Sequence, residues 1–277
     1  MTPEGKRARL EEAIFPLLCC ARCAGTSLEL RARSIACNQC AQIFPIHDSI
    51  PLMTTDPDVA FHWREESITS NHYSAQWIEQ IGRAADGWVL DLASGNNPDM
   101  HERVIKYDIF AVPNVDVVGR AEFLPFADRT FRNVISGAAF EHFQDPFRAI
   151  EQVFRVLCDG GEVYIETAFL QPVHAFPDHY FNMTLHGLEH LCNTFERMDS
   201  GVRPHQAPSF MLRWILQGWA DKLPHPERDA FLNTTVAEII GEYERDPFSQ
   251  RWMAAFSRAD MAEMAAGVYF HGRKRPR

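Results

Sequence analysis

The sequence lacks a long hydrophobic run, a glycine-rich phosphate motif and an excess of positive charge. No apolar stretch approaches the ~18 residues that a membrane-spanning helix needs, so we expect a soluble protein with no membrane contact. The formal net charge of −10 at pH 7 disfavours a broad nucleic-acid-binding face, which needs basic side chains to neutralise phosphates. Neither a Walker A motif nor G-x-G-x-x-G is present, which disfavours nucleoside triphosphates and nicotinamide dinucleotides as ligands.

Cysteine, in contrast, is concentrated near the amino terminus. Residues 17–40 hold five of the seven cysteines, and four of them form C-x2-C-x13-C-x2-C: Cys20, Cys23, Cys37 and Cys40. Two such pairs can each close a tight turn on one face of a tetrahedral metal, and four thiolates favour zinc in a closed, structural site. Disulfides and a redox pair are the alternatives, but a redox pair needs no second copy. We expect reduced thiols and a cytoplasmic protein.

The segments around these cysteines are short and strand-like. The stretch "SLELRARSIAC" (27–37) alternates apolar and polar residues, and "IFPIHDSIPLM" (43–53) contains prolines that we expect to end strands. Residues 17–53 resemble the small zinc-ribbon family related to the activator subunit of tRNA and protein methyltransferases, through L-x-C-x-x-C, C-x-x-C and P-I-x-D-x-I-P. Ala21 departs from that family, which often has proline there. In the family the ribbon stabilises or positions a methyltransferase, and the rest of this chain could be that partner.

A second unit begins after the ribbon with a helix expected over 72–87, ending at a glycine. The apolar run 88–92 predicts a strand with Asp91 near its carboxyl end, and Gly95 permits a tight turn against a ligand. Asp108 ends the next strand-like segment, where a carboxylate that binds a ribose would fall. A cofactor without phosphates relaxes the demand for glycines, and S-adenosylmethionine is such a cofactor.

The order of the following motifs strengthens this interpretation. "VLDLASGNNP", "LPF" (124–126), the strand-like "NVISGAAFEH" (133–142) and a Gly-Gly turn before "EVYIETA" (162–168) resemble class I methyltransferases over most of residues 85–200. The resemblance implies a Rossmann-like α/β sheet with helices on both faces. It also implies nine cofactor-binding positions: Asp91, Ala93, Ser94, Gly95, Asn97, Asp108, Ala121, Glu122 and Gly137.

Three residues depart from the family pattern. Ala93 stands at the place of a glycine, Arg120 where the family often has the aspartate that meets the adenine, and Arg132 where an aspartate commonly follows phenylalanine. Glu122 or backbone groups near Ala121 would then hold the adenine. A degenerate pocket that serves only as scaffold is therefore the alternative to an active site.

Methyl transfer needs an acceptor nucleophile aligned with the methyl group, and a base only when that nucleophile is weakly acidic. Residues 171–191 follow the strand expected at 162–168 and are dense in histidine and aromatic residues. We expect His174, His179 and Tyr180 to line the acceptor site, with His142 near the methyl group. A surface loop with packing aromatics is the competing interpretation, and the spacing gives little support to a histidine metal site.

The carboxyl-terminal part is expected to be helical. Helices are predicted over 209–223, starting at a serine cap, and over 256–267, with a last strand at 267–274. The expected domains are a zinc ribbon at 1–56 and a class I methyltransferase domain at 57–277, with a helical cap at about 205–264.

The sequence thus predicts a methyltransferase that uses S-adenosylmethionine and zinc and acts on a small-molecule or glycan-like acceptor. The segment after 133–142 lacks the Asn/Asp-Pro-Pro-aromatic motif of family members that methylate base amines, which disfavours nucleic acid. A noncatalytic scaffold, or a methyltransferase partner directed at RNA or protein, is the alternative, and the ribbon could dock a protein partner.

Overall fold

The computed structural model describes residues 2–56, 59, 73–84, 87–98, 101–174, 178–243, 255, 257 and 260. The chain forms two compact units. The first comprises Met1–Ala168 with Met183–Met198, and the second comprises Phe169–Asn182 with Asp199–Arg277. Within the described residues, no helix combines the length and apolar character that crossing a bilayer requires.

The first unit begins with a helical segment made of α1 (Pro3–Arg9), the π-helical turn η1 (Leu10–Ile14) and the 3-10 turn η2 (Phe15–Leu17). The Thr2 hydroxyl caps α1 by accepting a hydrogen bond from the Gly5 amide over 3.1 Å, and Pro3 fits the first turn because that position needs no amide hydrogen. No helix was predicted here.

Four antiparallel strands follow in the order β1-β2-β3-β4: β1 (Leu28–Leu30), β2 (Ser34–Cys37), β3 (Ile43–His47) and β4 (Ile50–Pro51). Asp48 and Ser49 have φ of +48° and +67°, as a two-residue hairpin turn requires. The prediction that prolines end these strands is confirmed for Pro51, the last residue of β4, and was wrong for Pro45. Pro45 lies inside β3 opposite Ser34, and its carbonyl accepts a hydrogen bond from the Leu52 amide.

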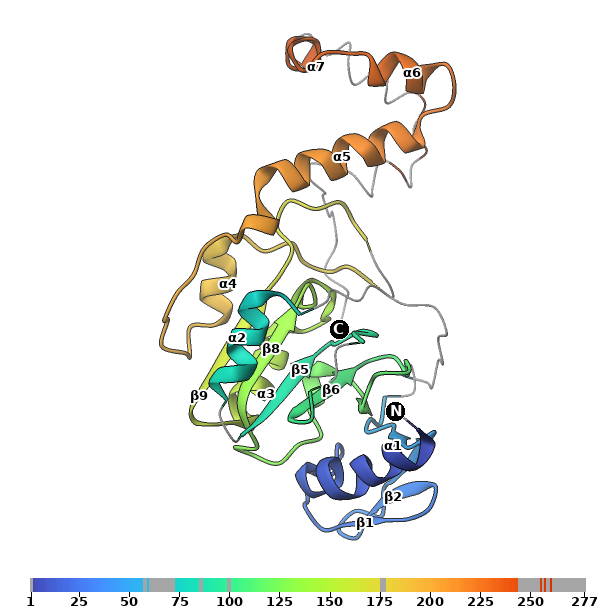
Figure 1. Cartoon of the computed structure of the whole chain (residues 1–277), viewed down its shortest axis with the longest axis vertical. Coiled ribbons are helices and arrows are strands. Elements are labelled where there is room, and N and C mark those ends of the chain that lie inside the picture. Colours follow the sequence, from blue (N-terminus) through green and yellow to red (C-terminus); the bar gives the residue numbers. More distant parts are fainter. Residues whose placement is uncertain are drawn as a thin grey trace, which may run out of the picture. The chain divides into compact units, whose positions relative to one another are not determined.

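The second sheet is fully parallel, in the order β7-β6-β5-β8-β9. Figure 1 shows β9, β8, β5 and β6 side by side. The strands are β5 (Trp88–Leu92), β6 (Val104–Asp108), β7 (Val117–Val118), β8 (Phe131–Gly137) and β9 (Leu157–Glu166). The predicted strands 88–92 and 104–108 are confirmed at both ends. The strand predicted over 133–142 stops at Gly137, because residues 140–142 form the 3-10 turn η4 (Phe140–His142).

Helices cover both faces of this sheet, as predicted. Alternation along β5 sends Val89 toward α2 (Ala75–Arg83) and Leu90 toward the core that includes α3 (Pro146–Val156). The turn η3 (Ala121–Phe123) and helix α4 (Leu185–Leu191) complete the unit. Helix α2 is shorter than predicted: Ser74 caps its start, and it ends four residues before Gly87.

The amino-terminal segment and the parallel sheet share one hydrophobic core. Leu10, Ile35 and Phe44 belong to the same buried cluster as Leu90 and Tyr107. Main-chain hydrogen bonds join the two parts at two places. Leu18 pairs with Phe126 in an antiparallel bridge, and Leu52 pairs with Val118 in a parallel bridge, followed by a 2.8 Å bond from the Met53 amide to the Val118 carbonyl. Isolated main-chain bridges therefore join the antiparallel sheet to the parallel sheet.

The second unit contains η5 (Pro204–Gln206), α5 (Pro208–Lys222), α6 (Glu227–Leu232) and α7 (Val236–Tyr243). Ala220, Leu223 and Phe231 form a small buried core. The predicted serine cap of α5 was wrong, since Ala207 is the N-cap and Ser209 lies inside the first turn. The strand predicted at 267–274 and almost all of the helix predicted at 256–267 lie outside the described residues.

Candidate cofactor site and cysteine cluster

The loop after β5 folds onto the end of β6. The amides of Ala93 and Ser94 both donate to the Tyr107 carbonyl, over 2.8 and 3.2 Å, and the Gly95 amide donates to Asp108 Oδ2 over 2.8 Å. Ala93 and Gly95 adopt left-handed conformations, with φ of +60° and +55°. A glycine would take the Ala93 conformation without the steric cost of a Cβ, which explains why this position favours glycine.

Asp108 is the carboxylate that organises this loop. Its Oδ1 accepts a 3.0 Å hydrogen bond from the Phe110 amide, while Oδ2 accepts the bond from Gly95. Burial raises the pKa of Asp108, and the amides of Phe110 and Gly95 partly oppose that rise. Each carboxylate oxygen has a second lone pair, so the group can also accept hydrogen bonds from ligand hydroxyls.

Asp91 lies on β5, the strand beside β6, and is almost completely buried. The Tyr73 hydroxyl donates to Asp91 Oδ2 over 3.0 Å. Burial raises the pKa of Asp91 to about 7, although the Tyr73 hydrogen bond and the positive charge of Lys106 oppose this. Near neutral pH this carboxyl can therefore bind or release a proton.

Ala121 and Glu122 lie in η3, directly after β7. The Gly119 amide donates to the Asp108 carbonyl over 2.9 Å, which holds this segment beside the end of β6. Both residues are buried, and Glu122 Oε1 accepts a 3.2 Å hydrogen bond from the amide of Asp145, the N-cap of α3. Glu122 thus supports the start of α3.

Arg120, which departs from the family pattern, is paired with an acid from the amino-terminal segment. Its guanidinium forms an ion pair with Asp56, and its carbonyl accepts a 2.9 Å hydrogen bond from the Tyr107 hydroxyl. The side chain is therefore neutralised locally.

Gly137 ends β8 and packs directly against α2. A Cβ at this position would lie 1.8 Å from Cζ2 of Trp77, so no other residue fits without displacing the indole. The Trp77 ring is buried, and its Nε1 has no hydrogen-bond partner in the part of the chain that the structure describes. All nine predicted cofactor positions thus lie at or just beyond the carboxyl ends of four neighbouring parallel strands, where ligands of open α/β sheets bind.

The four predicted catalytic residues fall into two groups. His142 lies in η4 of the first unit, next to the fully buried Glu141, whose Oε2 accepts a 2.8 Å hydrogen bond from the Thr167 hydroxyl. His174, His179 and Tyr180 belong to the second unit.

In the second unit, His174 and His179 are in contact. Their ring centroids lie 4.5 Å apart, and the His174 amide lies 3.3 Å from His179 Nδ1. His174 Nδ1 lies 2.8 Å from the Pro172 carbonyl oxygen, which can only accept, so Nδ1 carries the proton and the basic lone pair is on Nε2. Tyr180 is partly exposed, and its hydroxyl donates to Asp178 over 3.0 Å.

The four predicted metal ligands converge. The sulfurs of Cys20, Cys23, Cys37 and Cys40 all lie within 4.8 Å of one another. Two pairs are closer, with Cys20 Sγ 3.6 Å from Cys40 Sγ and Cys23 Sγ 3.7 Å from Cys37 Sγ. Zinc–sulfur bonds of about 2.3 Å in a tetrahedron place neighbouring sulfurs about 3.8 Å apart, so the spacing fits that metal.

The two C-x-x-C turns have the same local structure. The Ala24 amide donates to the Cys20 carbonyl, and the Ala41 amide donates to the Cys37 carbonyl. Both alanines are left-handed, with φ of +56° and +57°. All seven cysteines of the chain are free thiols, which leaves these four available as ligands.

A comparison with protein families matches residues 74–165 to a model described as a methyltransferase domain. Over this range the chain is similar to a methyltransferase domain. The match runs from the cap of α2 almost to the end of β9 and includes every predicted cofactor position. The prediction of a class I methyltransferase sheet, with helices on both faces, is therefore confirmed.

Solved structures resemble this chain over part of their length. A candidate methyltransferase from Bacillus halodurans C-125 is 29% identical, with 33% of this chain and 46% of that chain covered and a TM-score of 0.26. A complex of the Haloferax volcanii Trm112 methyltransferase activator with a candidate methyltransferase is 23% identical, with 33% of this chain and 50% of that chain covered and a TM-score of 0.28. Phosphoethanolamine N-methyltransferase 2 of Haemonchus contortus, in complex with S-adenosyl-L-methionine, is 15% identical, with 65% of this chain and 50% of that chain covered and a TM-score of 0.34. The matches thus span about half of those chains. No curated protein matches the sequence.

Three residues around the candidate cofactor site were not predicted from the sequence. Tyr73 contacts Asp91, Trp77 packs on Gly137, and Lys106 is buried in β6. Lys106 left a visible signal, because a lysine interrupts the otherwise apolar start of "VIKYD". Tyr73 and Trp77 left none, since aromatic residues on an amphipathic helix usually serve packing alone.

Proposed function

We propose that the chain is an S-adenosylmethionine-dependent methyltransferase that acts on a small-molecule or glycan-like acceptor. The observation that carries the proposal is the hydrogen bond from the Gly95 amide to Asp108, which folds the loop after β5 against the carboxylate ending β6. This arrangement lies within the matched methyltransferase domain, at the sheet edge where α/β proteins bind ligands.

The cofactor fits the donor and acceptor groups at this edge. Asp108 would accept hydrogen bonds from the ribose hydroxyls, and the backbone of Ala93, Ser94 and Gly95 would contact the methionine part, with Asn97 closing the loop. Asp91 supplies negative charge for a cationic ligand. Ala121, Glu122 and Gly137 would contact the adenine from the ends of β7 and β8. Bound S-adenosylmethionine supplies an electrophilic methyl group.

The acceptor would be bound by His174, His179 and Tyr180, with His142 near the methyl group. The proton on His174 Nδ1, fixed by the Pro172 carbonyl, keeps Nε2 basic, so His174 is the proposed general base. His179 would orient His174, because the amide of His174 donates to its ring and its own Nε2 lies 2.8 Å from the Asn182 side-chain oxygen.

We further propose that Cys20, Cys23, Cys37 and Cys40 bind one structural zinc ion and that residues 1–56 form a zinc ribbon. The sulfur spacing supports this proposal. The abundance of free thiols favours a reducing, cytoplasmic location.

The proposed ribbon acts as an internal support for the methyltransferase domain at 57–277, with a helical cap at about 205–264. The main-chain bridges from Leu18 to Phe126 and from Leu52 to Val118 support this role. A protein partner would then dock on the ribbon face that the sheet leaves open.

Calorimetric titration of the zinc-loaded chain with S-adenosylmethionine and S-adenosylhomocysteine tests the proposal. We expect both to bind at one site per chain, and D108A to lose that binding. D128N, which changes an exposed carboxylate, serves as the matched control. Absence of binding by the folded wild-type protein would favour the noncatalytic scaffold.

The acceptor class is tested separately, by incubating the protein with labelled S-adenosylmethionine and a metabolite extract and searching for compounds that gain a methyl group. Binding to tRNA at two salt concentrations tests the alternative, because phosphate contacts produce a steep salt dependence. RNA binding with such a dependence, together with no labelled small molecule, would replace the proposed acceptor class.

A further inference from the structure

A lysine is buried within the parallel sheet. Lys106 is 1% exposed, in the strand β6, which lies between β7 and β5 and whose residues are all buried. It lies in register with Asp91 on β5. An ammonium group is costly to bury unless charges and hydrogen-bond acceptors surround it. What Lys106 contacts therefore indicates what it is for.

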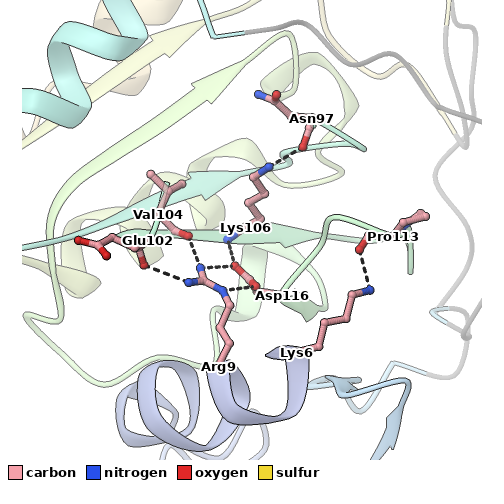
Figure 2. A network of polar contacts seen from close by, with 8 residues as sticks. All are labelled: Lys6, Arg9, Asn97, Glu102, Val104, Lys106, Pro113 and Asp116. Atoms are coloured by element: carbon pink, nitrogen blue, oxygen red, sulfur yellow. Dashed lines mark hydrogen bonds and ion pairs between the residues drawn. The ribbon is translucent and has the colours of Figure 1, made fainter. Parts of the chain in front are cut away.

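The ammonium group of Lys106 contacts the proposed cofactor loop. Its Nζ donates to the backbone carbonyl of Asn97, and it lies 5.8 Å from the centre of the Tyr73 ring. Figure 2 shows the side chain extending from β6 toward Asn97. The start of this loop is held by the bonds from Ala93 and Ser94 to the Tyr107 carbonyl, and its middle by the bond from Gly95 to Asp108. Lys106 holds its end.

The backbone of Lys106 is itself fixed by the amino-terminal helix. Its amide donates to Asp116 Oδ2 over 2.9 Å, and Asp116 also accepts two hydrogen bonds from Arg9, over 2.8 and 2.9 Å. Arg9 additionally donates to the carbonyls of Glu102 and Val104, over 3.0 and 2.5 Å. The network in Figure 2 thus runs from α1 through β6 to the loop at Asn97.

We propose that Lys106 is a positioning residue that holds the end of the loop 93–97 in its cofactor-binding conformation, with β6 anchored by Arg9 of α1. This inference rests on the proposed function, because that loop matters to catalysis only if it binds the cofactor. The ammonium fixes a backbone carbonyl, so it sets the position of the loop amides.

The chain offers a matched control in Lys6. Its Nζ also donates to a backbone carbonyl, that of Pro113 over 2.8 Å, but Pro113 lies outside the loop 93–97. K106M and K6M therefore remove the same type of interaction at two places in one network. Only K106M should affect the cofactor loop.

Two measurements test the proposal on the zinc-loaded, full-length protein. The first is hydrogen exchange of the amides of residues 93–97 without ligand, with the amides of β8 as an internal reference. We expect roughly ten- to hundredfold faster exchange of the loop in K106M, unchanged exchange of β8, and no change in K6M. The second is the affinity for S-adenosylhomocysteine, which should fall by a similar factor in K106M and recover in part in K106R.

Unchanged loop exchange and unchanged affinity in a folded K106M protein would overturn the proposal. An equal acceleration of loop and β8 exchange would also overturn it, since that result means a purely structural role. If K106M does not fold, D91N is compared with D91N/K106M, in which both buried ionisable side chains are replaced. An additional loss of loop protection in the double variant supports the proposal, and its absence overturns it.

Failure of the proposed function gives a different result. In that case the wild-type protein binds no S-adenosylhomocysteine, while the exchange measurement still reports on the contact between Lys106 and Asn97. Faster loop exchange in K106M would then support the role of Lys106 in positioning the loop 93–97, while the cofactor-binding role of that loop would be lost.

Discussion

The amide of Gly95 donates to the Asp108 carboxylate over 2.8 Å, so a single hydrogen bond ties the loop after β5 to the end of β6. The two residues are thirteen positions apart and come from neighbouring parallel strands. Because Asp108 also accepts a bond from Phe110, one carboxylate fixes the backbone on both sides of the proposed ribose position.

Replacing this carboxylate should abolish tight cofactor binding. D108A removes acceptors for the Gly95 and Phe110 amides as well as the proposed contact with the ribose. Hydrogen bonds to a charged group are worth about 1.5–3 kcal/mol each, so affinity for S-adenosylhomocysteine should fall by roughly a hundredfold or more. D108N retains one side-chain oxygen and should lose less. Equal affinities of D108A and wild type in calorimetry would contradict the assignment.

Much of this sheet edge could be predicted from sequence, because Asp91, Gly95 and Asp108 follow apolar strand runs that are unmistakable in a parallel sheet. The roles of Tyr73 and Lys106 could not be predicted. Tyr73 reaches Asp91 only through the packing of α2 on the sheet, and that geometry leaves no local signal.

In the amino-terminal segment too, local features could be predicted from the sequence and long-range contacts could not. The cysteine spacing predicts the cluster, since each C-x-x-C pair is closed by local turns. The contact between Arg9 and Asp116 joins residues 107 positions apart, and no pattern of neighbouring residues could reveal it. Pro45 was misjudged because a proline inside a strand is tolerated where its missing amide hydrogen is not needed.

A glycine at position 93 should stabilise the protein. Ala93 has φ of +60°, a conformation that costs an ordinary residue about 1–2 kcal/mol and glycine almost nothing. The greater freedom of glycine in the unfolded chain offsets part of this gain, by about 0.4–1 kcal/mol. A93G should therefore raise the free energy of unfolding by up to about 1 kcal/mol in denaturant titrations. A139G, at a residue with φ of −137°, should lower it. A destabilised A93G would argue against the left-handed loop.

Metal removal should release one zinc ion per chain and unfold the proposed ribbon. Structural zinc contributes directly to folding, and the ribbon shares its core with the parallel sheet, so chelation should also lower the melting temperature of the whole first unit. C20S and C37S should bind no zinc in native mass spectrometry. C158S is the control, because the Cys158 thiol donates instead to the Arg129 carbonyl. Retention of zinc by C20S would exclude the four-cysteine site.

Two arginines of α1 should differ sharply in their contribution to stability. The Arg9–Asp116 pair is largely buried, with side chains 11% and 8% exposed, whereas the Arg7–Glu11 pair is 31% and 49% exposed. Removing one partner of a buried pair leaves an uncompensated charge and costs about 3–5 kcal/mol. R9M should therefore destabilise the protein by roughly that amount, and R7M by less than about 1 kcal/mol. Similar effects of the two variants on urea unfolding would contradict the buried pairing.

The buried carboxyl of Asp91 should make stability depend on pH in an unusual direction. Burial raises its pKa from 3.8 to about 7 in the folded protein, against the opposing effects of the Tyr73 hydroxyl and Lys106, while the charges of Asp108 and Asp116 raise it further. Between these two values the folded state holds a proton that the unfolded state has lost, so this group makes the protein less stable as pH rises.

Asparagine at this position cannot ionise, yet its amide oxygen can still accept the hydrogen bond from Tyr73. The stability of D91N relative to wild type should therefore increase by up to about 4 kcal/mol as pH rises from 4 to 7, and then level off, since each pKa unit corresponds to about 1.4 kcal/mol. Urea unfolding of both proteins at several pH values measures this difference. A difference that stays constant across the range would mean that Asp91 ionises in the folded protein as it does in the unfolded chain, with Lys106 fully compensating its burial.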